Sequence, residues 1–87
     1  MICEPDDRGW SCSVTIGFGA GMTRHEVTVT PAELDRFAPG ATEPESLVKR
    51  SVRFLLERES KESILRRFAL LDIARYFPDY PVVIGRD

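Results

Sequence analysis

Two cysteines and a single histidine, Cys3, Cys12 and His25, are the side chains of this sequence best suited to metal binding or thiol chemistry. A structural zinc site needs two close pairs of ligands, whereas the cysteines are well separated and His25 adds only a third ligand. Nucleophilic catalysis needs a serine or cysteine beside a base and a supporting acid, and no segment near His25 supplies that set. We therefore expect no metal, no cofactor and no enzyme activity.

The two cysteines can either bond to each other or stay reduced. Residues Met1–Arg8 carry acidic side chains where an export signal would begin with basic residues and continue with an apolar stretch. We therefore expect no export signal and a cytoplasmic protein. Because thiols in the cytoplasm are kept reduced, this favours a buried free Cys12 and an incidental Cys3 over a Cys3–Cys12 disulfide.

A second distinctive group combines arginine and tyrosine near the C-terminal end. Both residue types are enriched at protein interfaces, where a few side chains carry most of the binding energy. The chain has 12 basic and 14 acidic residues, a net charge of −2, but residues 47–77 carry 8 basic and 4 acidic residues, so 8 − 4 = +4 there and −6 elsewhere. The candidate partner-binding residues are Arg66, Arg67, Arg75, Tyr76 and Tyr80. The alternative for the two tyrosines is that their rings complete the core.

These features predict a non-enzymatic protein that acts through protein–protein interaction. The partner is either a second copy of the chain, giving a homodimer, or another protein, in an antitoxin-like or adaptor role. The alternative is a DNA-binding transcriptional regulator that uses the basic helical half. Its helix-turn-helix would consist of Glu62–Phe68, a turn at Ala69–Leu71, and Asp72–Phe77. The last helix is short and apolar and offers only Arg75 and Tyr76 to bases, so nucleic acid is the less favoured partner.

Alternating side chains predict a β-hairpin over Trp10–Phe18 and Met22–Thr30. Apolar and polar residues alternate in both segments, which is typical of half-buried strands. The register must bring the two apolar faces together, because a slip of one residue would turn one of them toward water. The pairs that satisfy this are Cys12 with Val29, Val14 with Val27, and Ile16 with His25.

The loop of this hairpin is expected to be Gly19–Met22 rather than Ala20–Gly21, because alanine disfavours the positive φ of a tight hairpin turn. The nearby glycines indicate a turn between strands and not a phosphate-binding loop, which would have to open a helix. His25 is then interpreted as a partly buried structural histidine, with Cys12 in the core nearby.

Start and stop signals predict three helices after the hairpin. Thr30, Pro31 and Glu33 form a capping pattern at the first helix, and a similar signal precedes the second, which has the best helical periodicity of the chain. The predicted ranges are Pro31–Ala38, Pro44–Glu59 and Lys61–Phe77.

The third helix should break near Ala69–Leu71, because an unbroken helix would place Asp72 in the middle of its apolar stripe. Pro78 helps to end it. The last apolar run, Val82–Ile84, is either a third short edge strand or a tail packed on the core.

Length and composition limit the architecture to a single domain over residues 1–87. A chain of 87 residues, 43 % hydrophobic and 30 % charged, can form one hydrophobic core. It has no run of about 20 apolar residues, so we expect no membrane span. The predicted fold class is α+β: an antiparallel β-hairpin, with or without a third short strand, packed against about three α-helices of which the last is broken.

Four segments form a recognisable block in the C-terminal half: Leu47–Ser51, Phe54–Glu59, Lys61–Phe68 and Arg75–Tyr80. This block resembles a family of small bacterial proteins whose function is uncharacterised. The resemblance implies a hairpin followed by helices that end in a Tyr-Phe-Pro turn, here Tyr76–Pro78, and a bacterial cytosolic protein; it implies no activity, cofactor or partner. In that family an aspartate and a serine flank the leucine after the equivalent of Phe68. This chain has Ala69 and Leu71 there, so the usual cap of its last helix is missing.

Overall fold

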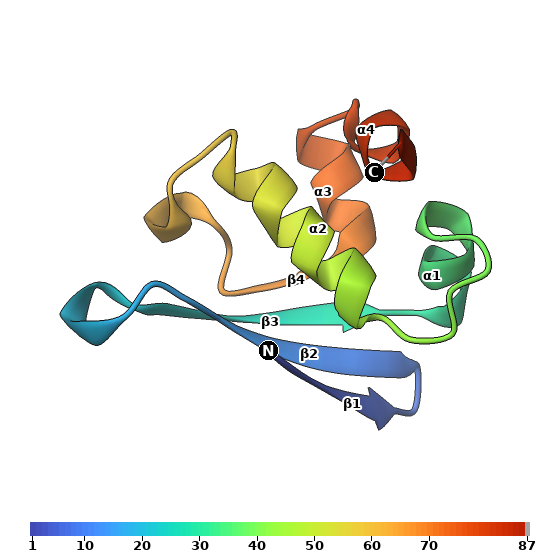
Figure 1. Cartoon of the computed structure of the whole chain (residues 1–87), viewed down its shortest axis with the longest axis horizontal. Coiled ribbons are helices and arrows are strands. Elements are labelled where there is room, and N and C mark those ends of the chain that lie inside the picture. Colours follow the sequence, from blue (N-terminus) through green and yellow to red (C-terminus); the bar gives the residue numbers. More distant parts are fainter. Residues whose placement is uncertain (87) are drawn as a thin grey trace.

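The computed structural model describes residues 1–86. Within this range the chain forms a four-stranded sheet and four α-helices, so the α+β class is confirmed (Figure 1). The strands are β1 (Ile2–Asp6), β2 (Gly9–Ile16), β3 (Thr23–Val29) and β4 (Arg67–Ala69); the helices are α1 (Pro31–Phe37), α2 (Glu45–Leu56), α3 (Leu70–Tyr76) and α4 (Tyr80–Arg86); and two 3₁₀ turns are η1 (Gly19–Gly21) and η2 (Lys61–Ser63). All of these helices lie on one face of the sheet, and no described helix covers the other face (Figure 1).

Strands β2 and β3 form the hairpin that the alternation predicts. Their register differs from the prediction by two residues, because Val14 lies opposite His25 and Cys12 lies opposite Val27. Side chains alternate with a period of two, so a two-residue slip keeps every side chain on its face and the hydrophobic pattern cannot detect it. The inward, buried residues of the pair include Cys12, Val14, Val27 and Val29.

The hairpin loop is longer than the predicted Gly19–Met22, because β2 already ends at Ile16. Positive φ angles at Gly17 (84°) and Gly19 (64°) lead the chain into the turn η1. Phe18, expected on the inward face of the strand, lies beyond the last pair of the ladder and is exposed.

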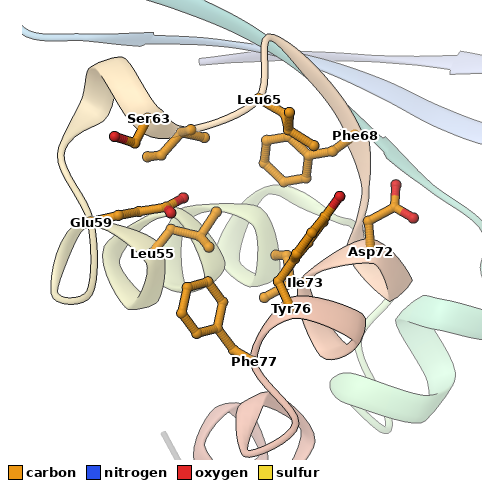
Figure 2. Close-up of a pocket in the computed structure, with 10 residues that line it drawn as sticks. Leu55, Glu59, Ser63, Leu65, Phe68, Asp72, Ile73, Tyr76 and Phe77 are labelled. Carbon is orange, nitrogen blue, oxygen red and sulfur yellow. The ribbon is translucent and has the colours of Figure 1, made fainter.

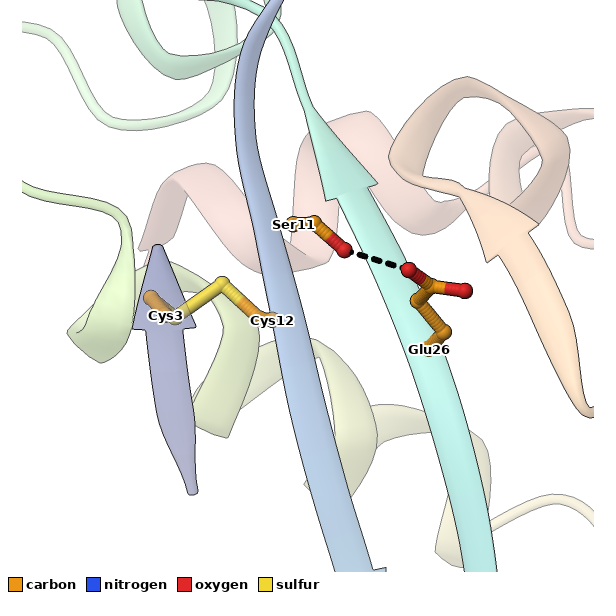
Figure 3. The surroundings of a disulfide bond; sticks show 4 residues. All are labelled: Cys3, Ser11, Cys12 and Glu26. Atoms are coloured by element: carbon orange, nitrogen blue, oxygen red, sulfur yellow. Dashed lines mark hydrogen bonds between the residues drawn. A yellow bond between two sulfur atoms is a disulfide. The ribbon is translucent and has the colours of Figure 1, made fainter. Parts of the chain in front are cut away.

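The edge strand β1 has no counterpart in the sequence prediction. Asp6 closes the turn to β2, since its Oδ1 accepts hydrogen bonds from the backbone N–H groups of Arg8 and Gly9, both at 2.9 Å. The strand places Cys3 directly opposite Cys12, and the two sulfurs form a disulfide, with S–S 2.03 Å (Figure 3). The prediction of free, reduced cysteines is therefore wrong, because it lacks the strand that brings Cys3 to Cys12.

Strand β4 runs parallel to β3 in a segment predicted to be helical. Phe68 lies opposite Val27, and the backbone N–H of Glu26 donates to the carbonyl of Arg66 at 2.8 Å. The range Lys61–Phe77 is thus a 3₁₀ turn, a strand and a short helix rather than one broken helix. Pairing with the open edge of β3 overrides the local helix propensity.

Helix α4 contains Val82–Ile84, so the edge-strand alternative is wrong. The alternative of packing on the core is confirmed, since Ile84 belongs to the core and Val83 packs against it, although the segment is helical. Pro81 is its second residue, where a missing backbone N–H removes no intrahelical hydrogen bond. The backbone N–H of Val83 donates to the carbonyl of Asp79 at 3.0 Å, which begins the helix.

The carboxylate of Glu33 joins the N-terminal ends of two helices. At α1 the predicted capping box forms: Glu33 N–H donates to Thr30 Oγ1 at 3.1 Å, and Thr30 N–H donates to Glu33 Oε1 at 2.8 Å. Its other oxygen, Oε2, accepts from the backbone N–H of Leu71 in α3 at 2.9 Å. Asp72 Oδ2 also accepts from Ala69 N–H at 2.9 Å. These two carboxylates replace the cap that is missing from the sequence of α3.

Candidate functional site

An apolar groove opens between the C-terminal end of α2, the segment that follows it, β4 and α3. Its volume is about 320 Å³. Leu55 of α2, Phe68 of β4 and Ile73 of α3 supply buried apolar surface, and Phe77 closes one end (Figure 2). A cavity of this size with mostly apolar walls and a few polar groups at its edge is the usual form of a small binding site.

The rim of the groove carries exposed apolar side chains. Tyr76 is 69 % exposed and Leu65 is 50 % exposed, although both line the groove. Tyr76 and Asp72 rise from α3 along one side of the groove, and Glu59 approaches from the end of α2 (Figure 2). The site therefore offers an apolar floor, an aromatic ring at its mouth and carboxylates at its edge.

The two carboxylates at the rim differ in their hydrogen bonding. Asp72 is engaged by the N–H of Ala69 and lies 3.9 Å from a guanidinium nitrogen of Arg75. The Glu59 carboxylate has no hydrogen-bond or ion-pair partner among residues 1–86. Glu59 is thus free to pair with a cationic group outside the molecule.

His25 holds one wall of the groove in place. It is 4 % exposed, and its Nδ1 lies 2.8 Å from the carbonyl oxygen of Leu65, so Nδ1 carries the proton and donates it. Nε2 lies 2.9 Å from the hydroxyl oxygen of Thr23, a group that can either donate or accept. Both ring nitrogens are therefore used, as expected of a structural histidine, and Leu65 is tied to the sheet.

The structure spreads the three candidate arginines over different surfaces. Arg75 lies on α3 beside the groove, whereas Arg67 faces the open side of the sheet and pairs with Glu26 at 2.9 Å. Glu26 also accepts from the hydroxyl of Ser11 at 2.6 Å (Figure 3). Arg66 borders a shallow hollow near Glu26 at the sheet edge. Of the predicted set, Tyr76 alone lines the groove, and Arg75 reaches only its neighbour Asp72.

Tyr80 is not a surface residue, so its predicted role in partner binding is wrong. It is 0 % exposed and packs edge-to-face on Phe37 and Phe54, with ring centroids 5.1 and 5.2 Å away. Ser51 Oγ donates to the carbonyl of Leu47, so the Tyr80 hydroxyl donates to Ser51 Oγ at 2.7 Å. Burial raises the pKa of Tyr80 to about 12. Its ring therefore completes the core.

The helix-turn-helix of the DNA-binding alternative is absent from the described structure. Residues 61–69 form the turn η2, a connecting segment and β4 instead of a first helix. Because β4 and not a helix directly precedes α3, α3 lacks the first helix that supports a recognition helix in the major groove.

No cluster of three or more His, Cys, Asp or Glu side chains in residues 1–86 could hold a metal ion, and Cys12 is consumed by the disulfide. The same range holds no helix long and apolar enough to cross a membrane.

No protein-family model, no curated protein and no solved structure matches this chain. The resemblance to small bacterial proteins stays a prediction. The groove is therefore the feature of the molecule from which a function can be inferred.

Tyr76 belongs to the predicted set and lines the groove, whereas the sequence pattern does not single out Glu59 and Leu65, which line it too. Glu59 is the last residue of the second predicted helix, and Leu65 belongs to the apolar, core-facing side of the third predicted helix. The local signal was Ser60, a residue type that often begins a helix. It indicates that the preceding helix ends nearby, but it does not indicate the groove that opens at this point.

Proposed function

We propose that this protein is a non-enzymatic interaction protein that binds an apolar side chain of another protein chain in the groove. The observation that carries the proposal is the open apolar cavity of about 320 Å³ with Tyr76 and Leu65 exposed at its mouth. Exposed apolar surface around a concave site is typical of interaction sites in soluble proteins. A monomer gains no stability from leaving this surface in water.

The chemistry of the rim supports a protein partner over a small polar ligand. Tyrosine is a frequent anchor in interfaces because its ring buries a large area at a small cost in side-chain entropy. Asp72 and Glu59 line the groove, and Arg75 lies beside Asp72, so both signs of charge are close to the apolar floor. A polar rim of this kind orients a partner whose apolar residue fills the groove.

Self-association as a homodimer and an antitoxin-like or adaptor role are the two forms of this proposal. We also propose a cytoplasmic location. In that compartment the reductants would open the Cys3–Cys12 disulfide, so the function must not depend on it. The disulfide lies between β1 and β2, whereas the groove is built from α2, β4 and α3. Binding in the groove is therefore expected in both redox states.

The test uses a library of random peptides displayed on phage and panned on the immobilised protein, alongside sedimentation velocity of the protein alone. Tyr76→Ser and Leu65→Ser remove the exposed apolar rim, and Val82→Ser removes a similarly exposed side chain on α4 as a control. We expect selected peptides with an apolar anchor, or self-association, to weaken about tenfold or more in the rim variants and not in the control. A strictly monomeric protein that selects no peptide overturns the proposal.

A further inference from the structure

The hairpin tip between β2 and β3 is the most conspicuous exposed apolar feature of the molecule. It extends beyond the helices at one end of the sheet (Figure 1). Phe18 at this tip is 91 % exposed, and Met22 is also exposed. The loop residues 17–22, Gly-Phe-Gly-Ala-Gly-Met, include no charged side chain, whereas turns of this kind are usually rich in asparagine, aspartate and serine.

The exposure of Phe18 has no explanation within the fold. The side chain lies beyond the last β2–β3 pair and does not belong to the core or to the partly buried residues packed against it. Glycines on both sides of it let the loop turn without any apolar residue at that position. An aromatic ring held out on a glycine-rich tip is suited to insertion into a cavity of another molecule.

The groove of the same chain has the size and lining for such a ring. A cavity of roughly 150 Å³ lined by leucine, isoleucine and phenylalanine is enough to hold benzene. The groove measures about 320 Å³ and is lined by the same kinds of residue, Leu55, Ile73 and Phe77 among them. It can take the Phe18 ring and still leave space for the glycine backbone beside it.

The charges next to the tip and the groove are complementary. Arg24 lies in β3 close behind the tip, is exposed, and has no hydrogen-bond or ion-pair partner among the described residues. Glu59 lines the groove and likewise has no partner there. A tip entering the groove would bring an unpaired arginine toward an unpaired carboxylate.

We propose that the hairpin tip of one molecule inserts Phe18 into the groove of a second copy of the chain, with Arg24 facing Glu59. This inference rests on the proposed function and names the occupant of its groove. If the exchange is reciprocal, each molecule donates one tip and accepts one, which gives a closed dimer. If it is one-way, the contacts repeat head to tail and give a closed ring or an open chain of molecules.

Sedimentation velocity and light scattering over a concentration series test the inference. Phe18→Ser should weaken self-association about tenfold or more for each contact, whereas Ile2→Ser, a similarly exposed site on β1, should leave it unchanged. Both side chains are exposed, so neither variant should alter the unfolding transition.

A charge reversal identifies the pairing. Arg24→Glu and Glu59→Arg should each weaken self-association, and the double variant Arg24→Glu/Glu59→Arg should restore it, because the two opposite charges then face each other again. A general effect of net charge would move the two single variants in opposite directions, because Arg24→Glu changes the net charge from −2 to −4 and Glu59→Arg changes it to 0. Weakening in both single variants, followed by recovery in the double variant, therefore identifies the pairing.

The outcomes separate this inference from the proposed function. Self-association that depends on Tyr76 and Leu65 but not on Phe18 overturns the inference and supports the groove. Self-association that depends on Phe18 but not on the groove residues also overturns it, since the tip would then dock elsewhere. A protein that stays monomeric while selecting groove-binding peptides refutes the second copy as occupant and leaves the proposed function supported.

Discussion

Replacing Glu33 with glutamine tests how much its buried carboxylate stabilises the protein by capping the N-terminal ends of both α1 and α3. Glu33 is 4 % exposed, and its two oxygens accept from Thr30 N–H at 2.8 Å and from Leu71 N–H at 2.9 Å. Glutamine has nearly the same shape but only one acceptor oxygen, and its amide group presents N–H donors in place of the other. In Glu33→Gln one of the two backbone N–H groups must therefore lose its acceptor.

The size of the effect follows from that lost acceptor. A hydrogen bond to a charged group contributes about 1.5–3 kcal/mol, and the negative charge at both helix N-termini is lost as well. We expect Glu33→Gln to lower the free energy of unfolding by about 2–3 kcal/mol. For a domain of this length each kcal/mol corresponds to roughly 4–8 °C in Tm, so Tm should fall by about 8–24 °C.

Urea and thermal unfolding followed by circular dichroism measure this change, with Glu45→Gln as the control. Glu45 is also in the first turn of a helix but is exposed, so its replacement should change stability by less than about 0.5 kcal/mol. Amide hydrogen exchange should also quicken at Thr30 or at Leu71. A Glu33→Gln protein as stable as the control, with both amides still protected, would refute the double-cap reasoning.

Two further predictions concern the core and the disulfide. Tyr80→Phe removes the hydrogen bond to Ser51 and should cost about 1 kcal/mol below pH 10. Because the pKa of Tyr80 is raised from 10.0 to about 12, the unfolded chain ionises first, and wild type should lose up to about 2–3 kcal/mol relative to Tyr80→Phe as pH rises from 10 to 12. Parallel urea titrations in which wild type does not lose stability relative to Tyr80→Phe between pH 10 and 12 would contradict the buried hydroxyl. Cys3→Ser breaks a disulfide with a sequence separation of 9, which corresponds to about 2.5 kcal/mol in the loop-entropy description. Hydrogen exchange should then quicken in β1 and stay slow in α2. Unchanged protection of the β1 amides would show that the disulfide is not what holds β1 on β2.

Local patterns predicted the parts of the fold that depend on near neighbours in sequence. The capping box of Thr30 and Glu33 was predicted because both residues belong to one turn of helix. The faces of β2 and β3 were predicted because alternation is a property of each strand alone. The two-residue error in register arose because the same alternation fits both registers.

The errors are concentrated where distant segments meet. Arg66 and Arg67 are good helix formers, and only the edge of β3, far away in sequence, turns their segment into a strand. The second oxygen of Glu33 reaches Leu71 across a sequence separation of 38. A tyrosine near arginines, such as Tyr80, fits an interface as well as a core. Only its packing against Phe37 and Phe54 decides for the core position.

The parallel pairing of β4 with β3 implies an order of folding events. Strands β1, β2 and β3 follow one another through short connections, so their pairing needs little loop closure, whereas β4 must return from far along the chain to reach β3. We expect β4 and α3 to dock last. The groove walls come from α2, β4 and α3, so the groove exists only after this step, and a molecule bound there would slow the local opening of the last segment to fold.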